Sequence, residues 1–350
     1  MKKHAPGLFL AVVVTLMFFS PTAGEAQSEP SSLTVMTHDS FSVSAGVIQS
    51  FEKEHRVKLR FLRSGDAGEA LNKAILSRNN PLADVFFGVD NTFLSRALKA
   101  DIFLPCSPSN LDSVFPGLGL DRENRLVPVD FGDVCINYDR KWFEENRLAP
   151  PTGLEDLVKP EYRGLLVVEN PATSSPGLAF LLATVAKFGE DGFIGFWKQL
   201  KKNDLLVTSG WKEAYWGKFS AASEGDRPLV VSYASSPAAE VFYAEKKMDR
   251  APTGVVIDNG SAFRQIEFAG ILKKTDKRAM AETFINFMLS KTFQQDIPLQ
   301  MFVFPANRHA VLPPVFKNHA RITPDPVSIS PDIISRKRDT WISQWTEAIL

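Results

Sequence analysis

Short apolar runs alternate with amphipathic runs through most of the chain. In the first third, positions 57, 59 and 61 are apolar and alternate with charged positions, as in a half-buried strand, whereas positions 43, 47, 48 and 51 recur at helical spacing. Alternation of strands and helices at this pace predicts an α/β lobe with a mostly parallel sheet. The predicted strands are 33–37, 57–61 and 85–89, and the predicted helices are 43–51, 71–76 and 93–98.

The second half repeats this style without repeating the sequence. Its predicted strands are 165–168, 205–207, 229–232 and 254–257, and its predicted helices are 178–188, 193–201 and 237–247. Two longer apolar runs, 127–138 and 254–271, are expected to cross between two lobes. Residues 284–288 and 341–345 have a helical pattern, and the proline-containing stretch 312–331 is expected to be a surface connection.

The N-terminus has the three zones of a secretory signal peptide. Lys2 and Lys3 precede an apolar run at 8–19, and small residues then lead to Ala26. The apolar run is too short to span a bilayer comfortably, so we expect cleavage after residue 26, although a retained anchor is the alternative. The remaining chain of about 320 residues favours two lobes over a single core.

The charge balance limits the kinds of binding partner, and the cysteine content limits the possible disulfides. Forty basic residues balance forty acidic ones, and no basic stripe points to nucleic acid. Only two cysteines are present, Cys106 and Cys135. An exported chain with an even count can form a disulfide, but a buried thiol at Cys135 fits its apolar run equally well.

Polar residues follow several predicted strands, at the sheet edge where ligands of α/β proteins bind. Asp66 and Ala67 come after the strand at 57–61, and Asp66 can instead simply cap the next helix. Ser174 and Ser175 precede Pro176 at a predicted helix start, where free N–H groups favour an anion. Ordinary N-capping is the alternative for these serines.

Two further segments carry aromatic rings and hydroxyls. Trp211 follows Gly210 just after a strand, so its indole can lie against a flat or cationic ligand or pack between lobes. The run from Tyr233 through Ala234, Ser235 and Ser236 again leads into a helix that begins with proline. Finding this arrangement twice suggests that both loops face one cleft.

Known catalytic and metal-binding motifs are absent from the sequence. It contains no HExxH, Walker A, GxSxG or GxGxxG pattern, and the histidines lack metal-ligand spacing. We therefore expect neither a cofactor nor a metal. His38 is the histidine of interest, because it ends the first strand next to Asp39.

Taken in order, these segments resemble the thiamine-binding subunits of bacterial thiamine ABC importers. The resemblance covers nearly the whole mature chain and rests on LTVMTHDSF (33–41), ADVFFGVDN (83–91), PATSSPGL (171–178), GWKEAY (210–215), SYASSPA (232–238) and WISQW (341–345).

The resemblance implies an α/β type II periplasmic-binding-protein fold, with two α/β lobes of mainly parallel sheets joined by inter-lobe strands. We expect the discontinuous first lobe at 33–130 and 262–350, and the second at 131–261. It also implies a monomer in the periplasm that binds thiamine, or thiamine phosphates, and delivers it to an inner-membrane ABC permease. The implied contacts are His38, Asp66, Ala67, Ser174, Ser175, Trp211, Tyr233, Ala234, Ser235 and Ser236.

Two departures from the family pattern keep alternatives open. The family has aromatic residues where this chain has His38 and Ala239, and Phe131, Trp216 or Phe242 are candidates to replace them. Another solute is therefore an alternative ligand, although the lack of adjacent tyrosines argues against ferric iron. A secreted thiamine-cleaving enzyme with Cys135 as nucleophile is the alternative from another class.

Overall fold

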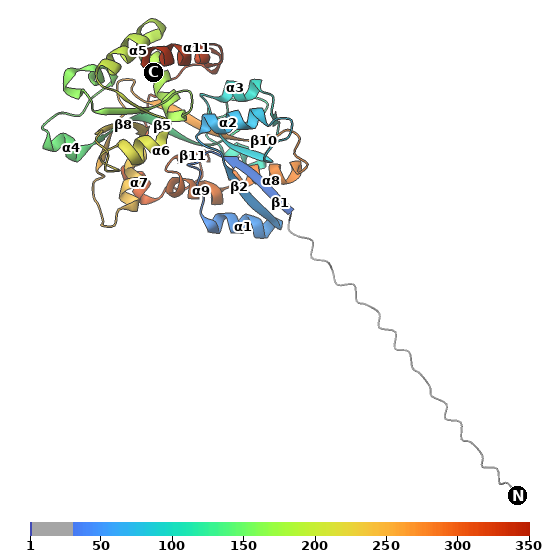
Figure 1. Ribbon diagram of the computed structural model, residues 1–350. Helices are drawn as coiled ribbons and strands as arrows, with labels where there is room; N and C mark the ends of the chain where they lie inside the picture. The colour runs from blue at the N-terminus through green and yellow to red at the C-terminus, as the bar shows by residue number, and fades with distance from the viewer. Residues whose placement is uncertain (2–30) are drawn as a thin grey trace. The chain divides into compact units, whose positions relative to one another are not determined.

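The computed structural model describes Met1 and residues 31–350, and residues 31–350 form one compact unit (Figure 1). The expected signal peptide, residues 1–26, falls almost entirely outside the described part. No helix in that part is both long enough and apolar enough to cross a membrane. The division into lobes at residues 130 and 262 stays a prediction.

One sheet of eleven strands runs through the unit in the order β2-β1-β3-β10-β5-β8-β6-β7, with β4 beside β10 and with β9 and β11 beside β5. Pairs at the two ends of this order are parallel, whereas the pairs made by β5 and β10 are antiparallel. The strands are β1 (Ser31–Thr37), β2 (Val57–Arg63), β3 (Val85–Asp90), β4 (Phe103–Leu104), β5 (Val127–Asp139), β6 (Leu166–Glu169), β7 (Leu206–Thr208), β8 (Leu229–Tyr233), β9 (Thr253–Val256), β10 (Phe263–Leu272) and β11 (Phe304–Pro305).

Helices cover both faces of this sheet. In β3, Val85 and Phe87 pack in a core with α1, α8 and α9, whereas Phe86 packs in a core that includes residues of α2 and α3. Burial of both strand faces explains why these strands are continuous apolar runs. The α-helices are α1 (Ala45–His55), α2 (Ala67–Leu76), α3 (Leu94–Lys99), α4 (Arg140–Glu145), α5 (Ser175–Lys202), α6 (Trp211–Glu213), α7 (Ser236–Tyr243), α8 (Arg278–Met288), α9 (Lys291–Gln300), α10 (Pro314–His319) and α11 (Pro331–Ile349).

Most predicted elements are present, but some of their bounds were wrong. The helices expected at 178–188 and 193–201 are both present as the two parts of α5, which is broken by a kink at Gly189, where φ is 72°. The strand expected at 254–257 is β9, and a second strand, β10, forms the later part of the run at 254–271. The proline-containing connection at 312–331 includes a short helix, α10. Strands β4 and β11 were not predicted, because two-residue strands leave no periodic pattern.

Both cysteines are free and buried, so the disulfide alternative is wrong. The Cys106 thiol donates to the carbonyl of Asn124 at 3.4 Å, and the Cys135 thiol donates to Oδ1 of Asn137 at 3.4 Å. Burial raises the pKa of Cys106 to about 12 and that of Cys135 well above its ordinary value. The thiols are therefore protonated and shielded at neutral pH.

We expect a thiol reagent such as Ellman's reagent to modify neither cysteine in the folded protein and both after denaturation in guanidinium chloride. The absorbance released in each condition measures this directly. Absence of any reactive thiol after denaturation without a reductant would reveal a disulfide and contradict the structure.

Candidate functional site

The carboxyl ends of several strands converge on one cavity of about 330 Å3. This volume is near the lower end of the range of about 300–1,000 Å3 that is typical of small-molecule sites. Seven of the ten predicted contacts line the cavity: His38, Asp66, Ala67, Ser175, Trp211, Tyr233 and Ser236. They follow β1, β2, β6, β7 and β8, as expected for an α/β sheet edge.

The other three predicted contacts lie next to the cavity but do not line it. Ser174 is fully buried at the N-cap of α5, close to Asp66. Ala234 is buried beside Cys135. Ser235 donates its hydroxyl hydrogen to the carbonyl of Phe302 and so helps to position a residue that does line the cavity.

Trp211 is held in place by its neighbours. Its ring stacks on Tyr215 with centroids 5.1 Å apart and an interplanar angle of 20°. Its Nε1 donates to the Ser232 hydroxyl at 2.9 Å, and that oxygen lies 3.0 Å from the Ser236 hydroxyl. These contacts hold the indole at the wall of the cavity.

Sequence reasoning missed several aromatic residues that line the cavity. Of the three rings suggested as replacements for the family aromatics, Trp216 lines the cavity, whereas Phe131 and Phe242 do not. Tyr243 and Phe302 also line it, with ring centroids 5.4 Å apart. Tyr243 lies one helical turn after Ala239 on α7, so the i, i+4 spacing was a signal for it.

Gln265 and Glu267 were missed as well. Both line the cavity from β10, and their separation by two residues puts them on one face of the strand. Gln265 Nε2 donates to the Tyr233 hydroxyl at 3.0 Å. The Tyr233 ring lies close to the backbone of Gly132. A Cβ at that position would lie only 3.0 Å from Tyr233 Cδ1. Strand pairing that brings these residues together was not visible in the sequence.

Segments distant in sequence meet around the cavity. Lys212 Nζ donates to the carbonyl of Asp39 at 3.0 Å. Gly210 approaches the Asp66 carboxylate so closely that a Cβ there would lie 3.0 Å from Oδ2. The loop after β7 thus closes against the segments that follow β1 and β2.

The Ser175 hydroxyl at the start of α5 already has a partner within the protein. The Ser175 hydroxyl donates to the carboxylate of Asp90, and the pKa of Asp90 is raised by burial to about 6. A protein carboxylate therefore lies at the helix N-terminus where an anionic ligand group was expected.

Acidic groups dominate the floor of the site. Burial raises the pKa of Asp66, against the opposing effects of the Ala67 amide, His38 and the Ser174 hydroxyl. His38 Nε2 lies 3.3 Å from Glu267 Oε1. Burial disfavours the His38 cation, but the neighbouring Glu267, together with the charges of Asp66 and Asp90, outweighs this effect and raises the pKa of His38. The arrangement suits a ligand that brings positive charge.

Cys135 does not take part in this site. Its side chain is fully buried, and it does not line the cavity. Asp133, two residues before Cys135 on β5, forms an ion pair with Arg264 at 2.8 Å. The geometry gives a nucleophile neither access nor a base.

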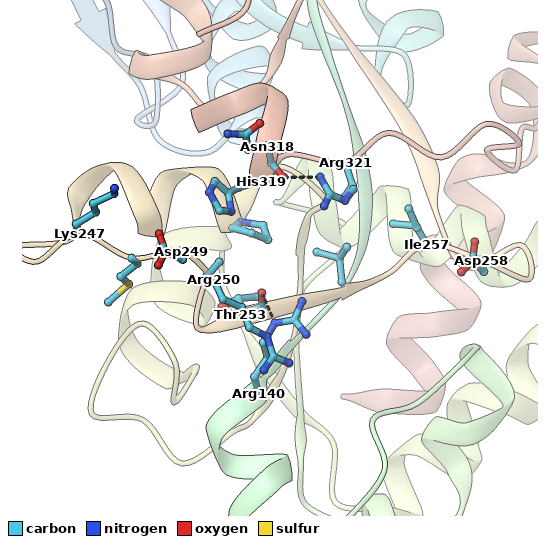
Figure 2. A pocket seen from close by; sticks show the side chains of 14 residues that line it. Arg140, Lys247, Asp249, Arg250, Thr253, Ile257, Asp258, Asn318, His319 and Arg321 are labelled. Atoms are coloured by element: carbon cyan, nitrogen blue, oxygen red, sulfur yellow. Dashed lines mark hydrogen bonds between the residues drawn. The ribbon is translucent and has the colours of Figure 1, made fainter. Parts of the chain in front are cut away.

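A larger pocket of about 840 Å3 lies elsewhere on the surface, between the loop after α7 and the end of α10 (Figure 2). It contains none of the predicted contacts. Two of its cations are engaged in the fold: Arg140 donates to the Thr253 carbonyl at 3.1 Å, and Arg321 donates to the Asn318 carbonyl at 2.9 Å (Figure 2). The smaller cavity is therefore the candidate site.

Comparisons with known proteins identify the family to which the chain is similar. Residues 80–327 match the family described as bacterial extracellular solute-binding protein. The thiamine-binding periplasmic protein of Escherichia coli is 31% identical over 322 residues, covering 91% of this chain and 93% of the relative, and that of Salmonella typhimurium is 30% identical over 321 residues with the same coverage. A solved periplasmic thiamin binding protein superposes with a TM-score of 0.81 at 29% identity, covering 91% of this chain and 96% of the other.

Glu169, at the end of β6, allows a test of how burial of a carboxyl group affects the stability of the fold. It is fully buried, and neither carboxyl oxygen has a hydrogen-bond partner in the described part of the chain. Burial raises its pKa well above the ordinary value. The folded state then binds this proton more tightly than the unfolded state, so the free energy of unfolding falls as the pH rises above about 4.3.

We therefore expect Glu169→Gln to raise the melting temperature at pH 8 by at least about 2 °C, and to have little effect at pH 4. Thermal unfolding followed by circular dichroism measures both values. Glu224→Gln, at an exposed position, is the control and should change neither. A lower melting temperature for Glu169→Gln at pH 8 would show that the carboxylate is stabilising.

Proposed function

This chain belongs to the bacterial extracellular solute-binding protein family, and we propose that it is the periplasmic thiamine-binding subunit of an ABC importer. The observation that carries the proposal is that a single cavity collects most of the residues onto which the family contacts fall. Similarity to thiamine-binding periplasmic proteins over about nine-tenths of the chain supports the same ligand.

The chemistry of the cavity suits thiamine. Thiamine has a flat aminopyrimidine, a permanently cationic thiazolium and a hydroxyethyl tail. Trp211, Tyr233 and Tyr243 supply aromatic faces for the rings, and the electron-rich face of an aromatic ring also attracts a cation. The carboxylates of Asp66 and Glu267 add negative charge.

Arg63 and Lys212 also line the cavity and give a phosphorylated tail two cationic partners. Thiamine phosphates therefore remain within the proposal. The serines at the start of α5 are less suited to this role than the sequence suggested, because Ser174 is buried behind the cavity and Ser175 already donates to Asp90.

Binding is proposed to close the cleft. The segments around the cavity come from both predicted lobes, and contacts such as that between Lys212 and Asp39 join them. A ligand that contacts both sides stabilises the closed population, which would then dock on the permease.

Protein purified without refolding and then denatured should release thiamine or a thiamine phosphate, detectable by mass spectrometry. Isothermal titration of ligand-free protein with thiamine should give one binding site, and the recovered thiamine should be intact. Release of separate pyrimidine and thiazole products would instead indicate the cleaving enzyme. A different released solute with no binding of thiamine would overturn the proposal.

Replacing Trp211 with alanine should weaken thiamine binding by at least about 30-fold, because an aromatic face that contacts the ligand in the cavity is lost. Circular dichroism should show an unchanged fold, since Trp211 is only partly buried. Trp142→Ala, in α4 and outside the cavity, is the matched control. Unchanged thiamine affinity for Trp211→Ala, measured by calorimetry, would remove Trp211 from the site.

A further inference from the structure

Three acidic residues stand side by side on three adjacent strands below the cavity. Glu267 of β10 is the register partner of Asp90 on β3 and of Asp130 on β5. Directly paired residues of neighbouring strands project to the same face of a sheet, so the three carboxyl groups form a row. Like charges placed opposite one another in this way destabilise a sheet.

The row is almost entirely removed from water. Asp90 and Asp130 are fully buried, and Glu267, which faces the cavity, is 8% exposed. Asp90 accepts bonds from the Thr92 amide and the Ser175 hydroxyl, whereas neither oxygen of Asp130 has a donor among the described residues. Without added positive charge nearby, three adjacent buried carboxylates are not all ionised at once.

Asp130 is the member of the row best placed to hold a proton, because it is fully buried and neither of its oxygens accepts a hydrogen bond from the described residues. Burial and the charge of Glu267 raise the pKa of Asp130 well above its ordinary value. The opposite holds for Glu267, where the neighbouring His38, at 3.3 Å, and Asp130 together overcome burial and lower the pKa. A protonated Asp130 beside an ionised Glu267 is the arrangement that satisfies both groups.

Other charged and titratable groups surround Glu267 from every side of the cavity. His38 is in ion-pair contact with it at 3.3 Å, and Arg338 lies beyond Asp90. The remaining groups are Asp39, Arg63, Asp66, Lys212, Tyr215, Tyr233 and Tyr243, all of which line the cavity.

A neutral side chain points independently to a ligand. Gln265 is 2% exposed and lines the cavity next to Glu267 on the same face of β10. Its Nε2 donates to Tyr233, but its Oε1 has no partner in the described part of the chain. A buried amide oxygen without a donor costs free energy unless a bound molecule supplies one.

We propose that Glu267 selects a cationic ligand in this cavity and that Asp130 releases a proton when the cation binds. The inference rests on the proposed function and deepens it. A permanent cation beside Glu267 offsets the negative charge that kept Asp130 protonated. Asp130 then ionises, and its proton passes to solvent, so that one positive charge enters the site as another leaves. Gln265 accepts a hydrogen bond from a donor group of the same ligand.

The sign of the pH dependence follows from this exchange. Below the pKa of Asp130 in the empty site, binding must expel a proton, so affinity falls as the pH decreases. A single linked proton changes the dissociation constant by about tenfold per pH unit. A neutral ligand of the same shape leaves Asp130 protonated and shows no such dependence.

The decisive comparison uses thiamine and its neutral thiophene analogue, in which carbon replaces the thiazolium nitrogen. Both ligands carry the same aminopyrimidine, so its own protonation cancels in the comparison. Calorimetry between pH 5.5 and 8, in buffers of different ionisation enthalpy, gives the affinity and the number of protons released. We expect release of about one proton for thiamine and none for the analogue.

Variants of Glu267 and Asp130 test their separate roles in cation selection and proton release. Glu267→Gln should weaken thiamine binding by at least about tenfold and binding of the analogue by less than about threefold. Asp130→Asn keeps the size of the side chain and should abolish most of the proton release. Asp84→Asn, a buried acid paired with Lys277 outside the cavity, is the control and should leave both quantities unchanged.

The outcomes separate the two hypotheses. Equal proton release for the two ligands, or unchanged release in Asp130→Asn, overturns this inference while leaving thiamine as the ligand. Failure of thiamine to bind the wild-type protein overturns the proposed function and this inference together. If Glu267→Gln does not fold, the Asp130→Asn titration and the ligand comparison still decide.

Discussion

The antiparallel pairing of β10 with β3 and β5 is the constraint on which the rest of the site depends. It places Gln265 opposite Gly132 and Glu267 opposite Asp130. A shift of one residue would turn both side chains to the opposite face of the sheet. The same register leaves room for the Tyr233 ring over Gly132, where a Cβ would lie only 3.0 Å away. The floor of the cavity is therefore set by backbone hydrogen bonds before any ligand is present.

This register concentrates negative charge in a place that water does not reach. Isolated buried carboxylates are costly, so the groups respond by keeping protons or by pairing with His38. The result is a site whose electrostatic balance favours an incoming cation. Aromatic rings that line the cavity, such as Trp211 and Tyr243, add a further attraction for a cation.

The two departures from the family pattern have structural explanations of different kinds. Ala239 leaves space on α7, and Tyr243 brings a ring to the cavity from one turn later on the same helix. His38 instead replaces a ring with a titratable group that contacts Glu267 and packs against Gly88, where a Cβ would come within 2.4 Å of its ring. The first change conserves aromatic character at the site, and the second couples the site to the buried acids.

The sequence by itself determined the fold class, most strands and helices, and the loops that meet at the cavity. Those features follow from local periodicity and from residues at strand ends, which are properties of short segments. It also located Asp66, Trp211 and Tyr233 at the cavity, because each follows a recognisable strand.

Only the tertiary structure decided which of the adjacent hydroxyls face the cavity, that the cysteines stay unpaired, and that Gln265 and Glu267 belong to the site. Those outcomes depend on the register between strands that are distant in the chain, such as β5 and β10, where the paired residues Asp133 and Arg264 lie 131 positions apart. No local pattern encodes that register, because it results from packing of the whole sheet.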